Sequence, residues 1–209
     1  MRRDNVSMAV IRRMPKYYRY LNELHQNGVD KISSRALAEQ MGVTASQIRQ
    51  DFNCFGGFGQ QGYGYHVDTL RNEIASIIGI DRCHRAIILG VGNIGRALIR
   101  NFQFEQCGFR LLAAFDADTA MAGDMINKVP VLHVDSLEEF CKEHEVEIAI
   151  LTIPSAYAQT MAARLADLGV KGIWNFTNVE LQMQNPDVIV EDVHFSDSMM
   201  TLCYRITEE

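Results

Sequence analysis

Three glycines near the middle of the chain have the spacing that holds the pyrophosphate of a dinucleotide. They belong to the segment Gly90-Val91-Gly92-Asn93-Ile94-Gly95, which follows an apolar run typical of a strand and opens a helical pattern. In that context the first glycine permits a tight turn, the second lets the backbone approach the pyrophosphate, and the third lets the helix pack close to the strand. The helix N-terminus then offers free N–H donors to the phosphates.

Asp116 strengthens this interpretation. It lies 21 residues beyond Gly95, at the end of the next predicted strand, where a carboxylate can accept hydrogen bonds from the hydroxyls of the adenosine ribose. A carboxylate would also repel a 2′-phosphate, so the pattern favours NAD(H) over NADP(H) as the bound cofactor. The alternative is a glycine turn in a doubly wound fold that binds another nucleotide or none.

A second candidate site is a helix-turn-helix that reads DNA. Helical patterns over residues 33–41 and 44–52 are separated by Gly42-Val43, and Thr44 with Gln47 forms a capping box at the start of the second helix. The exposed face of the second helix carries side chains that can hydrogen-bond base edges in a major groove. The candidates are Ser46, Gln47, Arg49 and Gln50. The alternative is a plain helical hairpin with polar residues facing solvent.

The residues around this motif predict the rest of a DNA-binding head. Residues 55–65 contain five glycines and four aromatic residues, which disfavours a helix and predicts a glycine-turned β-ribbon. Such a ribbon resembles the wing of a winged helix, with Gly59 and Gln60 near its tip as DNA contacts. The candidates for phosphate contacts are Arg12 and Lys16, with Arg13, Arg19 and Arg35. A solvated helix face explains any one of these cations equally well.

The elements that must position the two sites differ before and after residue 85. The first part has helical patterns, among them one opened by Pro15 and one over residues 68–78. In the second part strands are predicted at 86–89, 111–115, 129–133, 148–153 and 172–176, with helices after the first, third and fourth. Runs that are apolar on both faces and alternate with helices are typical of a doubly wound parallel sheet. We therefore predict the α/β class, with a winged helix-turn-helix domain over residues 1–80 and a Rossmann-like domain over residues 81–195.

The charge of the chain is divided in the same way. Residues 1–85 contain 12 Lys and Arg against 8 Asp and Glu, whereas residues 86–209 contain 8 against 18, and the net charge is −6. Only the first part can attract a polyanion such as DNA.

Composition disfavours several other kinds of protein. The second part barely completes a cofactor domain and leaves little room for a substrate site, so we predict no enzyme and no catalytic residue. Four histidines, His84, His133, His144 and His194, lack a carboxylate at an evident spacing, and no metal-binding pattern occurs.

The five cysteines form no C-x-x-C pair, although Cys54 near the predicted DNA reader is a candidate thiol switch. No apolar run is long enough for a membrane span or a signal peptide, which predicts a cytoplasmic protein.

Together the two parts resemble the Rex family of redox-sensing repressors over nearly the whole chain. The segments that carry the resemblance are Ile48 to Tyr65, Gly90 to Leu98, Ala114 to Asp116, Leu151 to Ser155 and Val190 to Phe195. The resemblance implies a homodimer that binds an inverted-repeat operator in double-stranded DNA when NADH is scarce. It also implies a C-terminal helix, within residues 196–209, that is exchanged between subunits.

The resemblance further implies roles for single residues. Thr152 and Pro154 would line the cofactor cleft, and Phe195 would reach the nicotinamide bound by the partner subunit. This sequence departs from the family pattern at His194, where an acid is usual, and at Asn101, where a tyrosine is usual, which puts the family's switching contacts in question. Two other functions remain open: a small NAD-dependent oxidoreductase with an interaction domain, and a repressor that senses CoA or NADPH.

Overall fold

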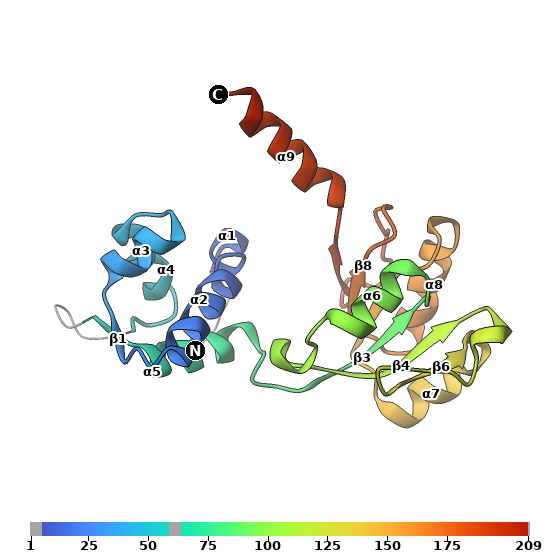
Figure 1. Ribbon diagram of the computed structural model, residues 1–209. Helices are drawn as coiled ribbons and strands as arrows, with labels where there is room; N and C mark the ends of the chain where they lie inside the picture. The colour runs from blue at the N-terminus through green and yellow to red at the C-terminus, as the bar shows by residue number, and fades with distance from the viewer. Residues whose placement is uncertain (1–5, 59–63, 209) are drawn as a thin grey trace. The chain divides into compact units, whose positions relative to one another are not determined.

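The computed structural model describes residues 6–58 and 64–208 (Figure 1). The chain divides into two compact units, residues 1–82 and residues 83–209. Each unit has its own buried core.

The first unit is mainly helical. Its described elements are α1 (Met8–Ile11), α2 (Met14–Gln26), β1 (Lys31–Ile32), α3 (Ser34–Met41), α4 (Ala45–Asn53), β2 (Tyr65–His66) and α5 (Val67–Ile78). The core forms because apolar side chains repeat every three or four residues along these helices. Tyr17 and Leu21 of α2, Ile48 and Phe52 of α4, and Leu70 of α5 are each 1% exposed or less.

The helix-turn-helix has the geometry that its sequence predicts. Gly42 ends α3 in the left-handed region at φ +66°, and the Thr44 hydroxyl accepts a hydrogen bond from Gln47 N at 3.1 Å to cap α4. Ala38, which is 3% exposed, lies in the core of the first unit. The two predicted helices are therefore confirmed to within two residues at each end.

The predicted ribbon over residues 55–65 differs from the described structure. Tyr65–His66 pairs antiparallel with Lys31–Ile32, whereas residues 54–56, directly after α4, form a turn, and residues 57–58 belong to no strand. The glycines at 56 and 57 have φ values of +106° and +78°, which fold the chain back so that the rings of Phe58 and Tyr65 both pack edge-on against Phe52, at 5.5 and 5.3 Å. Gly59 and Gln60 lie outside the described residues.

The second unit is a seven-stranded sheet covered by helices on both faces. Its strands are β3 (His84–Leu89), β4 (Phe109–Asp116), β5 (Met125–Ile126), β6 (Val129–His133), β7 (Ile148–Leu151), β8 (Gly172–Asn175) and β9 (Ile189–Asp192). Their order is β5-β6-β4-β3-β7-β8-β9, and all neighbours are parallel except β5 and β6. Without β5, this is the order of a Rossmann fold.

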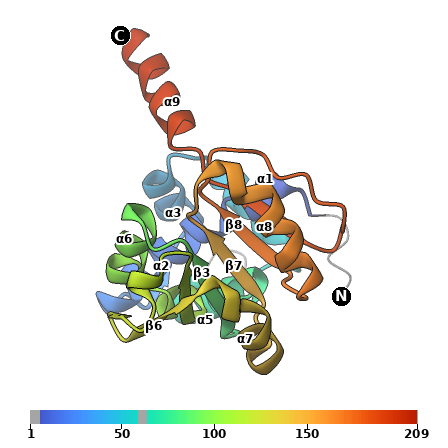
Figure 2. The same ribbon diagram turned by 90° about the vertical axis from the view of Figure 1, so that its right-hand side faces the viewer.

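The helices of this unit cover both faces of the sheet, as strands that are apolar on both faces require. In Figure 2, α6 (Asn93–Asn101) lies on one side of the sheet, and α7 (Leu137–His144) and α8 (Ser155–Asp167) lie on the other. Alternate residues of β3 supply the two cores, since Ile88 packs in the cluster with Ile99 of α6 whereas Leu89 packs in the cluster with Leu165 of α8. The five predicted strands and the three predicted helices are confirmed.

Two strands of this sheet have no counterpart in the prediction. The β5–β6 hairpin turns through Asn127 and Lys128, both at positive φ, which is the conformation that a two-residue hairpin loop requires. β9 is an edge strand with no buried residue, so it lacks the apolar alternation from which strands are predicted. α9 (Phe195–Thr207) follows it and ends the chain.

Candidate dinucleotide site and DNA-reading surface

The glycine turn between β3 and α6 is shaped by two close backbone approaches. Gly90 has φ +93°, and a Cβ on it would lie 2.7 Å from Thr152 O. A Cβ on Gly95 would lie 2.1 Å from Gly90 O, which no side chain can tolerate. Around Gly92, by contrast, no described atom lies within 4 Å of an added Cβ. The turn thus requires glycine at 90 and 95 for its own packing, and Gly92 leaves free space at the N-terminus of α6.

Asp116 and Thr152 fix this turn from the two neighbouring strands. The Asp116 carboxylate accepts hydrogen bonds from Val91 N at 2.6 Å and from Asp118 N at 3.0 Å. The Thr152 hydroxyl lies 2.7 Å from Gly90 O and donates to it. A carboxylate has about four acceptor positions, so Asp116 keeps acceptor capacity for ribose hydroxyls.

The site lies where an open parallel sheet binds ligands. β3 is the strand at which the order reverses, with β4 on one side and β7 on the other, and a crevice at the carboxyl ends of such strands is the usual cofactor position. Asn93, Ile94 and Pro154 are exposed around it, whereas the Val91 side chain is buried and offers only its backbone.

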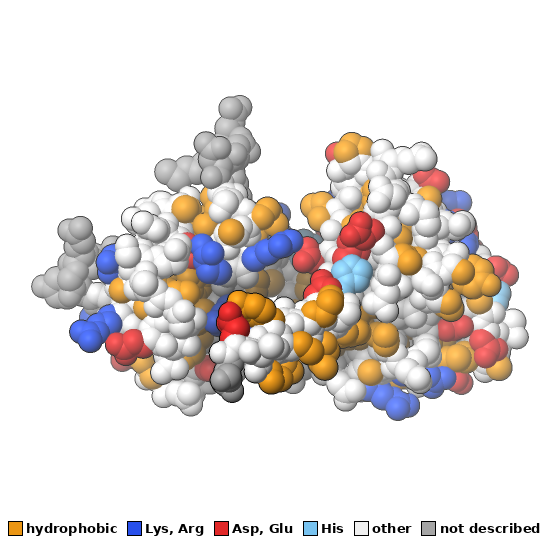
Figure 3. Space-filling view, turned by 90° about the horizontal axis from the view of Figure 1, so that it is seen from above, with side chains coloured by type: hydrophobic (Ala, Val, Ile, Leu, Met, Phe, Trp, Pro, Cys, Tyr) orange, Lys and Arg blue, Asp and Glu red, His pale blue; other side chains and the backbone are white. Residues whose placement is uncertain are grey.

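α9 differs from every other long helix of the chain because none of its described residues is buried. Its large apolar side chains are exposed by 49% to 64%, and they are Phe195, Met199, Met200, Leu202, Tyr204 and Ile206. Figure 3 shows hydrophobic side chains gathered along this helix. None of these side chains is packed as a core residue of the second unit would be. Phe195, at its start, contacts Phe176 with ring centroids 6.1 Å apart.

The predicted base-reading residues of α4 fall into two groups. Ser46, Arg49 and Gln50 are exposed, as expected. Gln47 is half-buried, and its amide donates a hydrogen bond to Asp51 at 2.8 Å, so its side chain is bound within the unit rather than free. Arg49 is held loosely by the Ser34 hydroxyl at 3.2 Å.

The predicted phosphate contacts also divide. Arg12, Arg19 and Arg35 are exposed. Lys16 is exposed as well, but its ammonium donates to Met41 O at 2.9 Å, at the C-terminus of α3. The Arg13 guanidinium forms a bidentate ion pair with Asp51 at 2.6 and 2.7 Å, so this side chain is bound within the unit.

Asp51 is the residue of this unit that sequence reasoning missed. It is 1% exposed and accepts hydrogen bonds from Arg13, the Tyr17 hydroxyl at 2.7 Å and Gln47. The spacings Gln47 to Asp51 and Arg13 to Tyr17 are both i, i+4 and could have revealed each half of the cluster. The contact between α2 and α4 that joins the halves spans 38 residues and has no local signal.

The pKa of Asp51 is set by two opposing effects. Burial raises it, but the hydrogen bonds from Arg13, Tyr17 and Gln47 outweigh burial, so the pKa lies below its ordinary value. Burial and the neighbouring carboxylate raise the pKa of Tyr17. The carboxylate therefore stabilises the folded unit when ionised. Because its folded pKa is lowered, this stabilisation is complete above the unfolded pKa of about 4 and is lost as the pH falls through the folded value.

We expect Asp51→Asn to lower the free energy of unfolding of the first unit by about 3 kcal/mol, because it breaks a buried ion pair. The variant should also lose the part of the acid sensitivity below about pH 5 that this carboxylate causes. Far-UV circular dichroism during urea unfolding measures both effects. Trp174, the single tryptophan, lies in the second unit, so its fluorescence transition should not move. Glu39→Gln, which removes an exposed ion pair with Arg35, is the control and should cost less than about 1 kcal/mol. Equal losses in the two variants would contradict the assignment.

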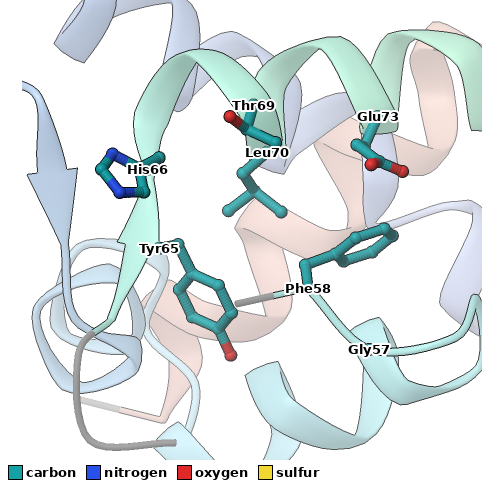
Figure 4. A pocket seen from close by; sticks show the side chains of 7 residues that line it. All are labelled: Gly57, Phe58, Tyr65, His66, Thr69, Leu70 and Glu73. Carbon is teal, nitrogen blue, oxygen red and sulfur yellow. The ribbon is translucent and has the colours of Figure 1, made fainter. Parts of the chain in front are cut away.

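A small pocket lies in the first unit between residues 57–58, β2 and α5. Its volume is about 150 Å³, and its lining consists of Gly57, Phe58, Tyr65, His66, Thr69, Leu70 and Glu73. Figure 4 shows Phe58, Tyr65 and Leu70 pointing into it. Ligand pockets usually measure about 300–1,000 Å³, so this pocket is too small for a dinucleotide.

The histidines correct one expectation. His84 lies 3.5 Å from the Glu147 carboxylate and His133 lies 3.2 Å from that of Asp135, so two of them do have acidic neighbours, in the first case through strand pairing. Among residues 6–58 and 64–208, no group of three or more His, Cys, Asp or Glu is placed to hold a metal ion. Within the same ranges no helix combines the length and the apolar character needed to cross a membrane.

Two family models match the chain, one in the first unit and one that covers most of the second. Residues 5–53 match the family described as "Putative DNA-binding protein N-terminus", and residues 81–179 match the family described as "CoA binding domain". The second match agrees with the Rossmann-like sheet.

Curated relatives extend the similarity over the full length. The redox-sensing transcriptional repressor Rex of Thermoanaerobacter pseudethanolicus is 50% identical over 208 residues, which cover 100% of this chain and 92% of the relative. The Rex protein of Clostridium perfringens strain 13 is 50% identical over 205 residues, covering 98% and 96%. These relatives are named as repressors, not as enzymes.

Solved structures agree. RSP, a Rex-family repressor, in complex with β-NAD⁺ and operator DNA superposes with a TM-score of 0.91 at 50% identity, covering 98% of this chain and 94% of that one. Its complex with β-NADH superposes with a TM-score of 0.89 at 48% identity, covering 97% and 95%. On this evidence the chain belongs to the Rex family of redox-sensing transcriptional repressors.

Proposed function

We propose that this protein binds an inverted-repeat operator as a homodimer in the bacterial cytoplasm and leaves it when NADH occupies the Rossmann-like unit. The observation that carries the proposal is the glycine turn, whose free space at Gly92 lies at a helix N-terminus beside the Asp116 carboxylate. The similarity to RSP, solved with NAD⁺ and operator DNA and also with NADH, supports the same pair of ligands.

The residues proposed for the dinucleotide divide by role. The backbone of Gly90 to Gly95 holds the pyrophosphate, Asp116 holds the adenosine ribose, and Thr152 with Pro154 lines the cleft on the β7 side. Phe195 extends from the start of α9 and would cover the nicotinamide of the partner subunit. Covering the nicotinamide with an apolar side chain removes it from water, which costs the oxidised cation more than the neutral reduced ring and so gives the two redox states different affinities.

The homodimer is proposed from α9. Its exposed apolar side chains at 195, 199, 202 and 206 follow spacings of four, three and four residues, which place them in one stripe along the helix. A stripe of this kind on a soluble protein marks a protein interface. We propose that a second copy of this chain covers it by exchanging α9.

A binding experiment tests this function. Fluorescence anisotropy with the RSP operator at fixed salt should show tight binding without ligand or with NAD⁺, and a drop of about 5- to 150-fold in affinity with NADH. NADPH and CoA are the comparison ligands, since Asp116 repels the 2′-phosphate of NADPH and the matching family model is described as CoA binding. Release by CoA but not by NADH would replace the proposed ligand, and no effect of any nucleotide would reject the proposal.

Among the exposed residues of α4, Arg49 is proposed as the main base reader because its guanidinium can pair with guanine through two hydrogen bonds. We expect Arg49→Ala to weaken operator binding by about 1–3 kcal/mol while leaving non-specific DNA binding nearly unchanged. Arg35→Ala, at an exposed position on α3, is the control and should weaken both to the same small extent. A uniform loss in Arg49→Ala would make Arg49 a phosphate contact instead.

A further inference from the structure

Asn175 is a buried amide with every hydrogen-bonding position in use. It ends β8 and is 1% exposed. Its nitrogen donates to Val179 O and to the Asp192 carboxylate, both at 2.7 Å. Its oxygen accepts from Thr177 N at 3.1 Å and from the Thr177 hydroxyl at 2.6 Å. An asparagine side chain offers two donors and two acceptor positions, so Asn175 holds four groups at once.

Three of these four hydrogen bonds hold the loop that follows β8. This loop lies at the carboxyl edge of the sheet, next to the end of β7, since Phe176 N donates to Leu151 O at 2.9 Å. Thr152, the residue that follows β7, donates a hydrogen bond to Gly90 O and so holds the glycine turn. The Asn175 amide is therefore connected to the dinucleotide site through one strand end.

The fourth hydrogen bond reaches the segment that carries α9. Asp192 is the last residue of β9, directly opposite Asn175 in the parallel register. β9 has no buried residue and Ile189 is 72% exposed, so within the strand only Val190 packs against the core. The position of its carboxyl end therefore also depends on the backbone ladder with β8 and on the hydrogen bond from Asn175 to Asp192. Val193 N donates to Asn175 O at 2.8 Å, and α9 begins two residues later.

We propose that Asn175 is the positioning residue that couples occupancy of the dinucleotide site to the setting of α9, through its hydrogen bond to Asp192. This inference rests on the proposed function, because it assumes that NADH binds at the carboxyl edge and that α9 joins the subunits. A ligand that moves the loop after β8 also moves the Asn175 side chain, because three hydrogen bonds join the two. Asn175 in turn moves Asp192, at the end of β9, from which the chain continues into α9.

The test removes the last link and leaves the ligand site intact. Asp192 is exposed, so Asp192→Ala keeps the fold and removes one hydrogen bond. Glu191→Ala is the matched control, because Glu191 is the neighbouring exposed acid on β9 and its side chain makes no hydrogen bond or ion pair with the described residues. Asp192→Asn is the conservative variant, since its amide oxygen still accepts from Asn175.

The readout is the ratio of operator dissociation constants with and without saturating NADH, together with the dissociation constant of NADH itself. We expect Asp192→Ala to reduce the ratio at least about threefold out of a response of about 5- to 150-fold, with NADH affinity of the free protein changed less than twofold. Glu191→Ala and Asp192→Asn should keep the wild-type ratio. By reciprocity, the NADH affinity of the operator complex should rise in Asp192→Ala by the factor that the ratio loses.

Two results would overturn the coupling role alone: an Asp192→Ala ratio equal to that of Glu191→Ala, or a loss of NADH affinity in the free protein large enough to explain the lost response. A wild-type protein whose operator binding ignores NADH would overturn the proposed function and this inference with it.

Discussion

Replacing Leu202 with aspartate is expected to separate the dimer and to abolish tight operator binding. Leu202 is 49% exposed and lies in the apolar stripe of α9, so in the proposed dimer its burial is worth about 1.5–3 kcal/mol per subunit. A carboxylate there also has no partner once it is covered. Because a dimer binds two half-sites through one connected protein, its loss should reduce operator affinity by about 10²- to 10⁴-fold.

Sedimentation velocity measures the first effect and fluorescence anisotropy the second. Thr201→Asp is the matched control, since Thr201 lies on the same helix, is exposed, and is turned away from the stripe by about a third of a turn. It should remain dimeric and bind the operator as the unmodified protein does. If Leu202→Asp sediments like Thr201→Asp, α9 is not the dimer interface.

The second large effect is expected from filling the free space at Gly92. Gly92→Leu should lower NADH affinity at least about 100-fold, because a side chain there occupies the place where the backbone must approach the pyrophosphate. The fold should be unaffected, since an added Cβ meets no described atom within 4 Å. Operator binding without ligand should stay within about twofold, and NADH should no longer release the DNA.

Calorimetric titration with NADH and operator binding with and without NADH together measure this outcome. Ala163→Leu, which adds the same side chain at an exposed position of α8, is the control and should behave as the unmodified protein. A Gly92→Leu protein that still binds NADH would remove the glycine turn from the site. One that loses operator binding to the same degree would show that the two units are not separable sensor and reader.

Local sequence pattern predicted most of the sheet, and the reason lies in burial. The predicted strands at residues 86–89 and 148–153 are apolar on both faces. Short runs of this kind are typical of strands in a parallel sheet that is covered by helices on both sides. β9 escaped prediction because an edge strand next to solvent needs no apolar alternation. The described ends of the ribbon predicted over residues 55–65 differ from that prediction because β2 pairs with a two-residue strand from before α3. These partners are 33 and 35 positions apart in the sequence, and no local rule identifies them.

The candidate sites show the same division. The roles of Gly90 and Gly95 follow from the glycine motif itself, because the close packing of helix against strand that excludes a Cβ at these positions recurs wherever the motif occurs. The direction of the Gln47 side chain does not follow from its position on α4, since it depends on Arg13 and Tyr17 arriving from another helix to complete the Asp51 cluster. Helical spacing identifies which residues share a face, but not which of them are already bound.

The Asp51 cluster separates two kinds of position on α4, and this has a consequence for how such a repressor diversifies. Gln47 and Asp51 hold α4 against α2, so a change at either residue alters the position of α4 in the DNA-binding unit. The side chains of Ser46 and Gln50 do not take part in this cluster and are open to substitution. New target preferences can therefore arise by exchanging two or three side chains, in evolution or by design, while the framework that presents them is inherited unchanged.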